Sequence, residues 1–351
     1  MNQPTNARRM LLVALGAGTL AAPFAALAQQ PNVPAGAPGK VWRIGVLSPS
    51  SRAAGVPFAA AIVQGLREHG YVEGGNLVIE RRPADGDPAR LPGLAAELVQ
   101  LKVDLILASA YDATLAAQAA TDTIPIVMTS TSDPVGNGII KSLARPGGNI
   151  TGIADLSAEL GGKRLEMLLA MMAGAAANPA AAKTPKVSRV AVLGRSQTRA
   201  QLWALKHIQE AGLRVGITIV PFYGGTVEEI DQAFASMRQQ RVAALMLLPH
   251  PFLVQQRKQI AQLALQQRLP VSAAYAIHAE AGCLMSYGAD LLDTFRRSAV
   301  FVDKIFKGRN PAELPVEQPV KYELVINGKT AKALGLAIPQ ALLISADRVI
   351  E

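Results

Sequence analysis

The amino-acid sequence predicts an α/β fold made of two doubly wound lobes, each built on a parallel β-sheet. Short apolar runs alternate with amphipathic stretches of about ten to fifteen residues, which is typical of βα units. This alternation occurs in two successive series, separated by an alanine-rich stretch with prolines that ends at Pro185. The chain has 351 residues, enough for two domains of about 150 residues that each bury a core.

The first series begins at Val41 and ends at the helix-breaking sequence Pro146, Gly147, Gly148. Its short apolar runs predict buried strands, and the stretches between them have helical periodicity. The expected strands are 42–47, 77–80, 104–108 and 125–129, and the expected helices are 57–69, 91–101, 112–120 and 138–143.

The second series follows a helical stretch over 158–172 and repeats the same alternation. Residues after 282 are too few for a third domain, so we expect them to return and complete both sheets. The expected strands are 189–193, 214–220, 243–248, 270–273 and 284–287, and the expected helices are 199–211, 227–239, 253–267 and 291–306.

The first 28 residues are expected to be a secretory signal peptide. Arg8 and Arg9 precede an apolar run over 10–27, and a small-residue cleavage site ends at Ala28. The alternative is a transmembrane anchor, which is disfavoured because Pro23 and two glycines interrupt the run. The paired arginines resemble a twin-arginine signal, but the flanking pattern is incomplete, so both the twin-arginine and the general secretory route stay open. Residues 29–40 are expected to form a flexible lead-in.

The charge distribution argues against nucleic acid as a partner. Lys and Arg number 35 against 26 Asp and Glu, a formal net charge of +9. However, the basic pairs Arg81–Arg82 and Arg296–Arg297 have acidic neighbours, which is typical of solvated helix faces rather than of a phosphate-binding patch. The single cysteine, Cys283, permits no internal disulfide.

No motif predicts a metal, a cofactor or an enzyme. The four histidines are widely separated and have no ligand spacing. The sequence Gly328-Lys329-Thr330 ends like a phosphate-binding loop, but Glu323 stands where that loop needs glycine. A hydrolase would need a nucleophile and a base at strand ends, and only Ser196 and His250 could be combined for that purpose.

Ligands of doubly wound sheets bind at the carboxyl ends of the strands, so the loops there hold the candidate site residues. Small hydroxyl residues dominate these loops in the first half and aromatic residues appear in the second half. This pattern indicates a polar grip on one lobe and an apolar wall on the other. The candidates are Ser48, Ser50, Ser109, Ala110, Ser130 and Asp133 in the first half, and Arg195, Tyr223, Pro249, His250 and Tyr275 in the second.

Many sequence blocks, in order, resemble those of a known family. They include RIGVLS (43–48), GLREHGY (65–71), VEGGN (72–76), SDPV (132–135), SLARPGGN (142–149), GKRL (162–165), FRR (295–297), VDKI (302–305), LPVEQP (314–319), ELVIN (323–327) and KTAKALGL (329–336). Over nearly its whole length after the signal, the chain resembles the ABC-transporter substrate-binding proteins associated with tryptophan and tyrosine uptake.

The resemblance implies a type I periplasmic binding fold, in which two lobes close on a ligand about a three-segment hinge. The expected crossings lie near 152–157, 279–283 and 318–321. The first lobe would comprise 41–152 plus 282–317, and the second 153–281 plus 318–351.

Departures from the family pattern prevent transfer of the ligand identity. Ser109 and Ala110 stand where the family often has Gly-Thr, and Ser132 stands where it often has glycine. Asp133 is either the partner of a ligand amino group or the cap of a helix that begins at Pro134. Tyr223 and Tyr275 either stack on a ligand ring or pack within the lobe.

The expected function is that of an exported, periplasmic solute-binding receptor of an ABC importer. It would act as a monomer, capture an amino acid or a similar aromatic solute, and deliver it to an ABC permease in the inner membrane. The alternative is a periplasmic sensory module that feeds a membrane signalling partner. Sequence does not separate the two, because both use the same closing lobes.

Overall fold

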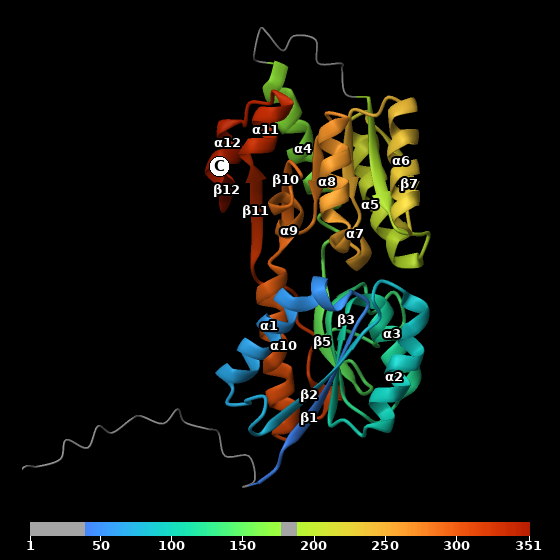
Figure 1. Ribbon diagram of the computed structural model, residues 1–351, viewed down its shortest axis with the longest axis vertical. Helices are drawn as coiled ribbons and strands as arrows, with labels where there is room; N and C mark the ends of the chain where they lie inside the picture. The colour runs from blue at the N-terminus through green and yellow to red at the C-terminus, as the bar shows by residue number, and fades with distance from the viewer. Residues whose placement is uncertain (1–38, 177–187) are drawn as a thin grey trace, which may run out of the picture. The chain divides into compact units, whose positions relative to one another are not determined.

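The computed structural model describes residues 39–176 and 188–351 of the chain (Figure 1). The expected signal peptide, almost all of the lead-in and the end of the stretch up to Pro185 lie outside these residues. In the part of the chain that is described, no helix has the length and apolarity needed to cross a membrane.

The first sheet contains five strands in the order β2-β1-β3-β4-β5, and all of its pairings are parallel. The four strands expected in this half are present, and a further strand, β5, follows them. The bounds are β1 Trp42–Ser48, β2 Leu77–Pro83, β3 Leu105–Ser109, β4 Ile126–Ser132 and β5 Ile150–Asp155.

Helices cover both faces of this sheet, which with them forms the first lobe (Figure 1). On one face, α1 (Arg52–Glu68) packs against α10 (Leu291–Phe306), and both contribute to one apolar cluster with the sheet. The other face is covered by α2 (Leu91–Gln100) and α3 (Ala110–Ala120). The contact between α1 and α10 needs glycine at position 65, because a Cβ there would lie 2.1 Å from the carbonyl oxygen of Arg296.

The second sheet contains seven strands in the order β12-β11-β10-β9-β8-β6-β7. Only the pairing of β10 with β11 is antiparallel among the pairings of its described strands. The bounds are β6 Arg189–Gly194, β7 Thr218–Tyr223, β8 Ala244–Leu247, β9 Val271–Ala273, β10 Met285–Ala289, β11 Tyr322–Asn327 and β12 Arg348–Ile350.

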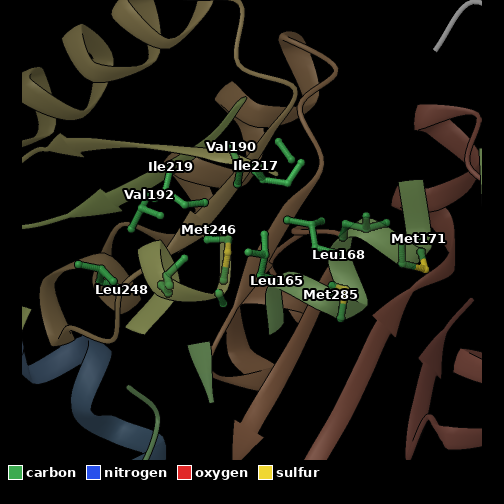
Figure 2. Packing of buried hydrophobic residues seen from close by; sticks show 14 of the residues in the cluster. Leu165, Leu168, Met171, Val190, Val192, Ile217, Ile219, Met246, Leu248 and Met285 are labelled. Carbon is green, nitrogen blue, oxygen red and sulfur yellow. The ribbon is translucent and has the colours of Figure 1, made fainter. Parts of the chain in front are cut away.

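The second lobe consists of this sheet and the remaining helices. Alternating side chains of β6 and β8 enter two separate cores, as expected for a sheet covered on both faces. Val190 and Val192 point to the cluster formed with α4 and α5 (Figure 2). Leu193 joins the cluster formed with α6 and α8. The helix bounds are α4 Gly161–Ala176, α5 Arg199–Arg214, α6 Val227–Gln239, α7 Pro251–Gln255, α8 Arg257–Gln266, α9 Ala276–Glu280, α11 Gly328–Leu334 and α12 Gln340–Ser345.

The fold class is confirmed: two predominantly parallel, doubly wound sheets are connected by three chain crossings. The first crossing runs from the end of β5 to α4, and the second lies at Asp290, between β10 and α10. The third leads from Glu317, which bridges to Ile153 of the first sheet, to β11 of the second.

The expected lobe limits differ from the structure at two places. Residues 285–289 were expected in the first lobe, but Met285 pairs with Ser272 of β9 and Ile326 of β11 in the second sheet. The second crossing therefore lies after these residues and not at 279–283. The first crossing lies after Asp155, because β5 continues the first sheet beyond the expected limit at 152.

Three expected elements are also different. Residues 138–143 are irregular and not a helix, and they begin with Gly138 at a φ of 74°. The strand expected from 214 begins later, because α5 continues to Arg214 and the chain then turns at Gly216, whose φ is 71°. The helix expected over 253–267 is two helices, α7 and α8, separated at Gln256.

Candidate functional site

A cavity of about 160 Å³ is lined by residues of both lobes. The first lobe contributes the carboxyl ends of its strands and the beginnings of α1 and α3. The second lobe contributes the beginning of α5, the loop before α7, and Tyr275. The cavity therefore lies where doubly wound sheets place their ligands.

Most of the residues predicted from the strand-end loops line this cavity, whereas Asp133, Arg195 and Tyr223 do not belong to its lining. The predicted residues that line the cavity are Ser48, Ser50, Ser109, Ala110, Ser130, Pro249, His250 and Tyr275.

The carboxylate of Asp133 serves the turn that follows β4. Its Oδ1 accepts a hydrogen bond from the backbone N–H of Gly136 at 2.8 Å, and its carbonyl oxygen accepts one from Asn137 at 3.0 Å. Glycine is required at 136, because a Cβ there would lie 2.0 Å from Asp133 Oδ2. Of the two interpretations of Asp133, the geometry fits the capping one, with a turn in place of the expected helix.

Arg195 and Tyr223 contact other residues of the second lobe. The Arg195 guanidinium lies 5.4 Å from the centre of the Phe252 ring. The Tyr223 ring approaches Gly194, where a Cβ would meet its Cδ1 at 3.4 Å, and burial raises the pKa of the Tyr223 phenol. Both contacts are packing within the second lobe.

Asp112 and His250 face each other from opposite lobes inside the cavity. The distance between His250 Nε2 and Asp112 Oδ2 is 3.7 Å. His250 Nδ1 accepts the backbone N–H of Phe252 at 3.0 Å, so the neutral ring carries its proton on Nε2, toward Asp112. Burial lowers the pKa of His250 below its ordinary value, and Asp112 opposes this only in part. Asp112 is therefore a cavity carboxylate whose only basic neighbour within 4.0 Å, among the described residues, is an imidazole that is neutral at pH 7.

Asp155 and Tyr275 form a second contact between the lobes. The Tyr275 hydroxyl donates to Asp155 Oδ2 at 2.7 Å, and the backbone N–H of Ser157 donates to Oδ1 at 2.7 Å. Both Asp155 and Tyr275 are buried, and both line the cavity. Burial, and then the neighbouring carboxylate, raise the pKa of Tyr275 well above its ordinary value. This hydrogen bond ties the end of β5 to the beginning of α9.

Replacing Tyr275 by phenylalanine is expected to lower the free energy of unfolding by about 2 kcal/mol, because a buried carboxylate loses its closest side-chain donor. Ser130 Oγ, at 3.5 Å, is too distant to replace it. Chemical denaturation measures the effect. Tyr223→Phe is the matched control and should change the stability by less than about 0.5 kcal/mol. A Tyr275→Phe variant as stable as the wild type would contradict a stabilising role for this bond.

Two residues at the strand ends have a left-handed backbone. Ala110 has a φ of 63° and Ser130 a φ of 59°, and both line the cavity. Side chains with a Cβ rarely adopt this conformation, because the Cβ approaches the following carbonyl oxygen. Strain of this kind is found at ligand sites, where the surrounding structure imposes it.

Replacing Ala110 by glycine is expected to raise the free energy of unfolding by about 1 kcal/mol, since the strain at φ 63° exceeds the entropic penalty of glycine. Ala113→Gly, three residues further along α3, should have the opposite effect and destabilise by about 1 kcal/mol. Thermal or urea unfolding of the two variants compares them. Equal destabilisation by both would show that Ala110 is not strained.

Cationic and aromatic side chains complete the lining. Arg81 and Arg82 pair with Glu73 at 2.6 Å and Glu97 at 2.7 Å, whereas Arg52 at the start of α1 has no ion-pair partner within residues 39–176 and 188–351. Aromatic rings come from the first lobe as well as the second, contrary to the expected division into a polar and an apolar lobe. The first-lobe rings are Phe58, Tyr111 and Phe295.

The site residues that sequence reasoning missed are Asp112, Asp155, Arg52 and Gln201. Asp112 was within reach, because it lies in the first turn of an expected helix that follows a strand end. Arg52 lies before the helix expected over 57–69, and Asp155 ends a strand that was not expected. In the part of the chain that the structure describes, no three His, Cys, Asp or Glu side chains are placed to hold a metal ion.

Comparison with known proteins identifies the family. The family model described as "ABC transporter substrate binding protein" matches residues 43–350. The chain belongs to this family. The family consists of solute-binding proteins, so this substrate-binding protein is not an enzyme.

Similar proteins support the same assignment. The substrate-binding protein is 26% identical over 275 residues to a tyrosine-binding protein of Clostridioides difficile, covering 78% of this chain and 75% of the relative. A conserved domain protein of Vibrio cholerae superposes with a TM-score of 0.80 at 26% identity, covering 88% of this chain and 100% of that one. An ABC domain of Streptococcus pneumoniae in complex with L-Trp gives a TM-score of 0.79 at 25% identity, covering 89% and 100%.

Proposed function

We propose that the protein is an exported receptor of an ABC importer that captures an amino acid between its lobes and delivers it to a permease in the inner membrane. It acts in the periplasm as a monomer, without a cofactor and without binding nucleic acid. The family is that of ABC transporter substrate-binding proteins, whose solute is handed to a membrane partner.

The observation that carries the choice of ligand is the pair of opposite charges in the cavity. Asp112 provides a carboxylate whose charge is not neutralised by the nearby imidazole of His250. Arg52 provides a guanidinium at the beginning of α1. An amino acid presents an ammonium and a carboxylate, which these two groups can bind by charge-assisted hydrogen bonds.

The aromatic part of the lining supports an apolar or aromatic side chain. The Phe58 and Phe295 rings lie 4.9 Å apart, centre to centre, and both belong to the cavity wall. A ligand ring can pack against such a pair. The tyrosine-binding relative and the L-Trp complex are consistent with this ligand class.

Calorimetric titration of the purified protein with the twenty L-amino acids tests the proposal. At least one amino acid should bind, and the analogue of it that lacks either the amino or the carboxyl group should bind much more weakly. Tyramine and 3-(4-hydroxyphenyl)propionate are such analogues of tyrosine. If no amino acid binds to the folded protein, the proposal fails.

Export and delivery need separate measurements. Expression of the full chain in a Gram-negative host should give a periplasmic protein whose mass corresponds to cleavage after Ala28. Uptake of the labelled ligand should fall when the gene is deleted and return when it is restored. Retention in the cytoplasm, or uptake that does not depend on the gene, would contradict the transport role.

A further inference from the structure

Gln201 is a buried cavity residue whose amide has a fixed orientation. It lies in the first turn of α5, lines the cavity, and is 4% exposed. Its Oε1 accepts two backbone hydrogen bonds, from Arg195 N–H at 2.9 Å and Ser196 N–H at 3.2 Å. Because both of these groups can only donate, they identify this atom as the oxygen and the other as Nε2.

The backbone around Gln201 is shaped to hold the amide in this orientation. At Gly194 a Cβ would lie only 2.7 Å from Gln201 Oε1, so a side chain at that position would displace the amide. The Oε1 atom of Gln201 therefore faces the loop, where the N–H groups of Arg195 and Ser196 already donate to it.

The Nε2 group of Gln201 donates to no atom of the described chain. Among the described residues that line the cavity, Gln201 alone has a buried side-chain polar atom without a partner. A buried donor without an acceptor is destabilising, and native structures contain few of them. An unpaired donor in a ligand cavity is explained when the ligand supplies the acceptor.

Among the lining residues near Gln201, Thr198 accepts the backbone N–H of Gln201 with its hydroxyl oxygen at 3.4 Å and forms no hydrogen bond with Nε2. Ala158, Ala200 and Ala204 form small apolar neighbours in the second-lobe wall. Methyl groups cannot accept a hydrogen bond, so these alanines do not pair with Nε2.

We propose that Gln201 Nε2 donates to an oxygen of the bound solute and thereby selects the side chain of the ligand. The selected solutes carry a phenolic, carbonyl or carboxylate oxygen at the end that meets the second lobe. This inference rests on the proposed function, since it concerns the amino acid held between the lobes.

The selection follows from the hydrogen-bonding capacity of the side chains. A phenol oxygen accepts a hydrogen bond, a phenyl ring offers no such oxygen, and an indole N–H only donates. A ligand without an acceptor leaves Nε2 unpaired and desolvated, which lowers affinity by roughly tenfold to a hundredfold.

Calorimetry with matched ligand pairs at pH 8 tests the selection in the wild-type protein. The pairs are L-tyrosine with L-phenylalanine, and L-glutamine with L-norleucine. In whichever pair binds, the member that carries an oxygen in its side chain should bind roughly tenfold to a hundredfold more tightly than the other member. L-tryptophan should bind less tightly than L-tyrosine.

Gln201→Glu tests the residue itself. It keeps an oxygen for the Arg195 and Ser196 N–H groups and replaces only the donor by a second oxygen, so the preference for the oxygen-bearing ligand should disappear. Gln262→Glu, which adds the same charge at an exposed position of α8, should keep the preference. Circular dichroism verifies folding. If the Gln201 variant does not fold, the inference is tested by the ratios of the affinities of the wild-type protein for the two members of each ligand pair.

The outcomes separate the two proposals. If no amino acid binds at all, the proposed function fails. If amino acids bind but the two members of a pair bind equally, or if Gln201→Glu keeps the preference, the inference on Gln201 is overturned while the proposed function stands.

Discussion

Replacing Asp112 by asparagine is expected to weaken the binding of an amino acid by about tenfold to a hundredfold. Asp112 faces the cavity, and the imidazole of His250, 3.7 Å away, is neutral, so the carboxylate is available to a ligand ammonium. A charge-assisted hydrogen bond to such a group contributes about 1.5 to 3 kcal/mol, which the neutral amide does not supply. Calorimetric titration with the tightest-binding amino acid measures the change.

Asp133→Asn is the matched control for this experiment. It removes one negative charge from the same lobe, while the amide oxygen can still accept the Gly136 N–H. Asparagine also tolerates the φ of 41° at this position. We expect the affinity of this variant to stay within about twofold of wild type. A larger loss with Asp133→Asn than with Asp112→Asn would assign the ammonium contact to Asp133.

Acid is expected to destabilise the protein through His278, which is 3% exposed in α9. Its Nδ1–H donates to the Tyr275 carbonyl oxygen at 3.3 Å. Burial, assisted by the positive charge of Arg257, lowers the pKa of His278 from 6.5 to about 4. The folded protein therefore favours the neutral ring. The full stabilisation is present above pH 6.5 and is lost as the pH falls toward 4, by about 3 kcal/mol in all.

His278→Gln should remove this part of the pH dependence, because the glutamine amide can still donate but does not titrate. Urea unfolding between pH 7.5 and pH 4 measures it, and the variant should lose about 3 kcal/mol less than wild type over this range. Parallel curves for wild type and His278→Gln would contradict the assignment.

The sequence was most informative where one local pattern determines the structure. The strands at 42–47 and 104–108 are short, largely apolar runs, and β1 and β3 lie there. Strand β10 was assigned to the wrong lobe, because the sequence of an apolar run does not indicate which strands it will pair with. That choice depends on Ser272 and Ile326, which are distant in the chain.

The site was predictable to the extent that it consists of strand ends. Ser48 and Ser109 could be identified because the last residues of parallel strands all lie at the carboxyl edge of the sheet. Phe58 and Phe295 could not, because they lie inside helices, and only the packing of α1 against α10 brings them to the cavity. Gln201 was missed for a similar reason, since its role depends on the backbone of the preceding loop.

The late position of α10 in the chain has a consequence for biosynthesis. The five strands of the first sheet are complete at Asp155, but one face of that sheet and the inner side of α1 remain uncovered until residues 291–306 have been made. A ribosome-bound chain therefore exposes Ile62 and Leu66 while the whole second sheet up to β10 emerges. The core of the first lobe is therefore completed only after most of the second lobe has been synthesised, and exposed apolar surface of this kind is what chaperones protect.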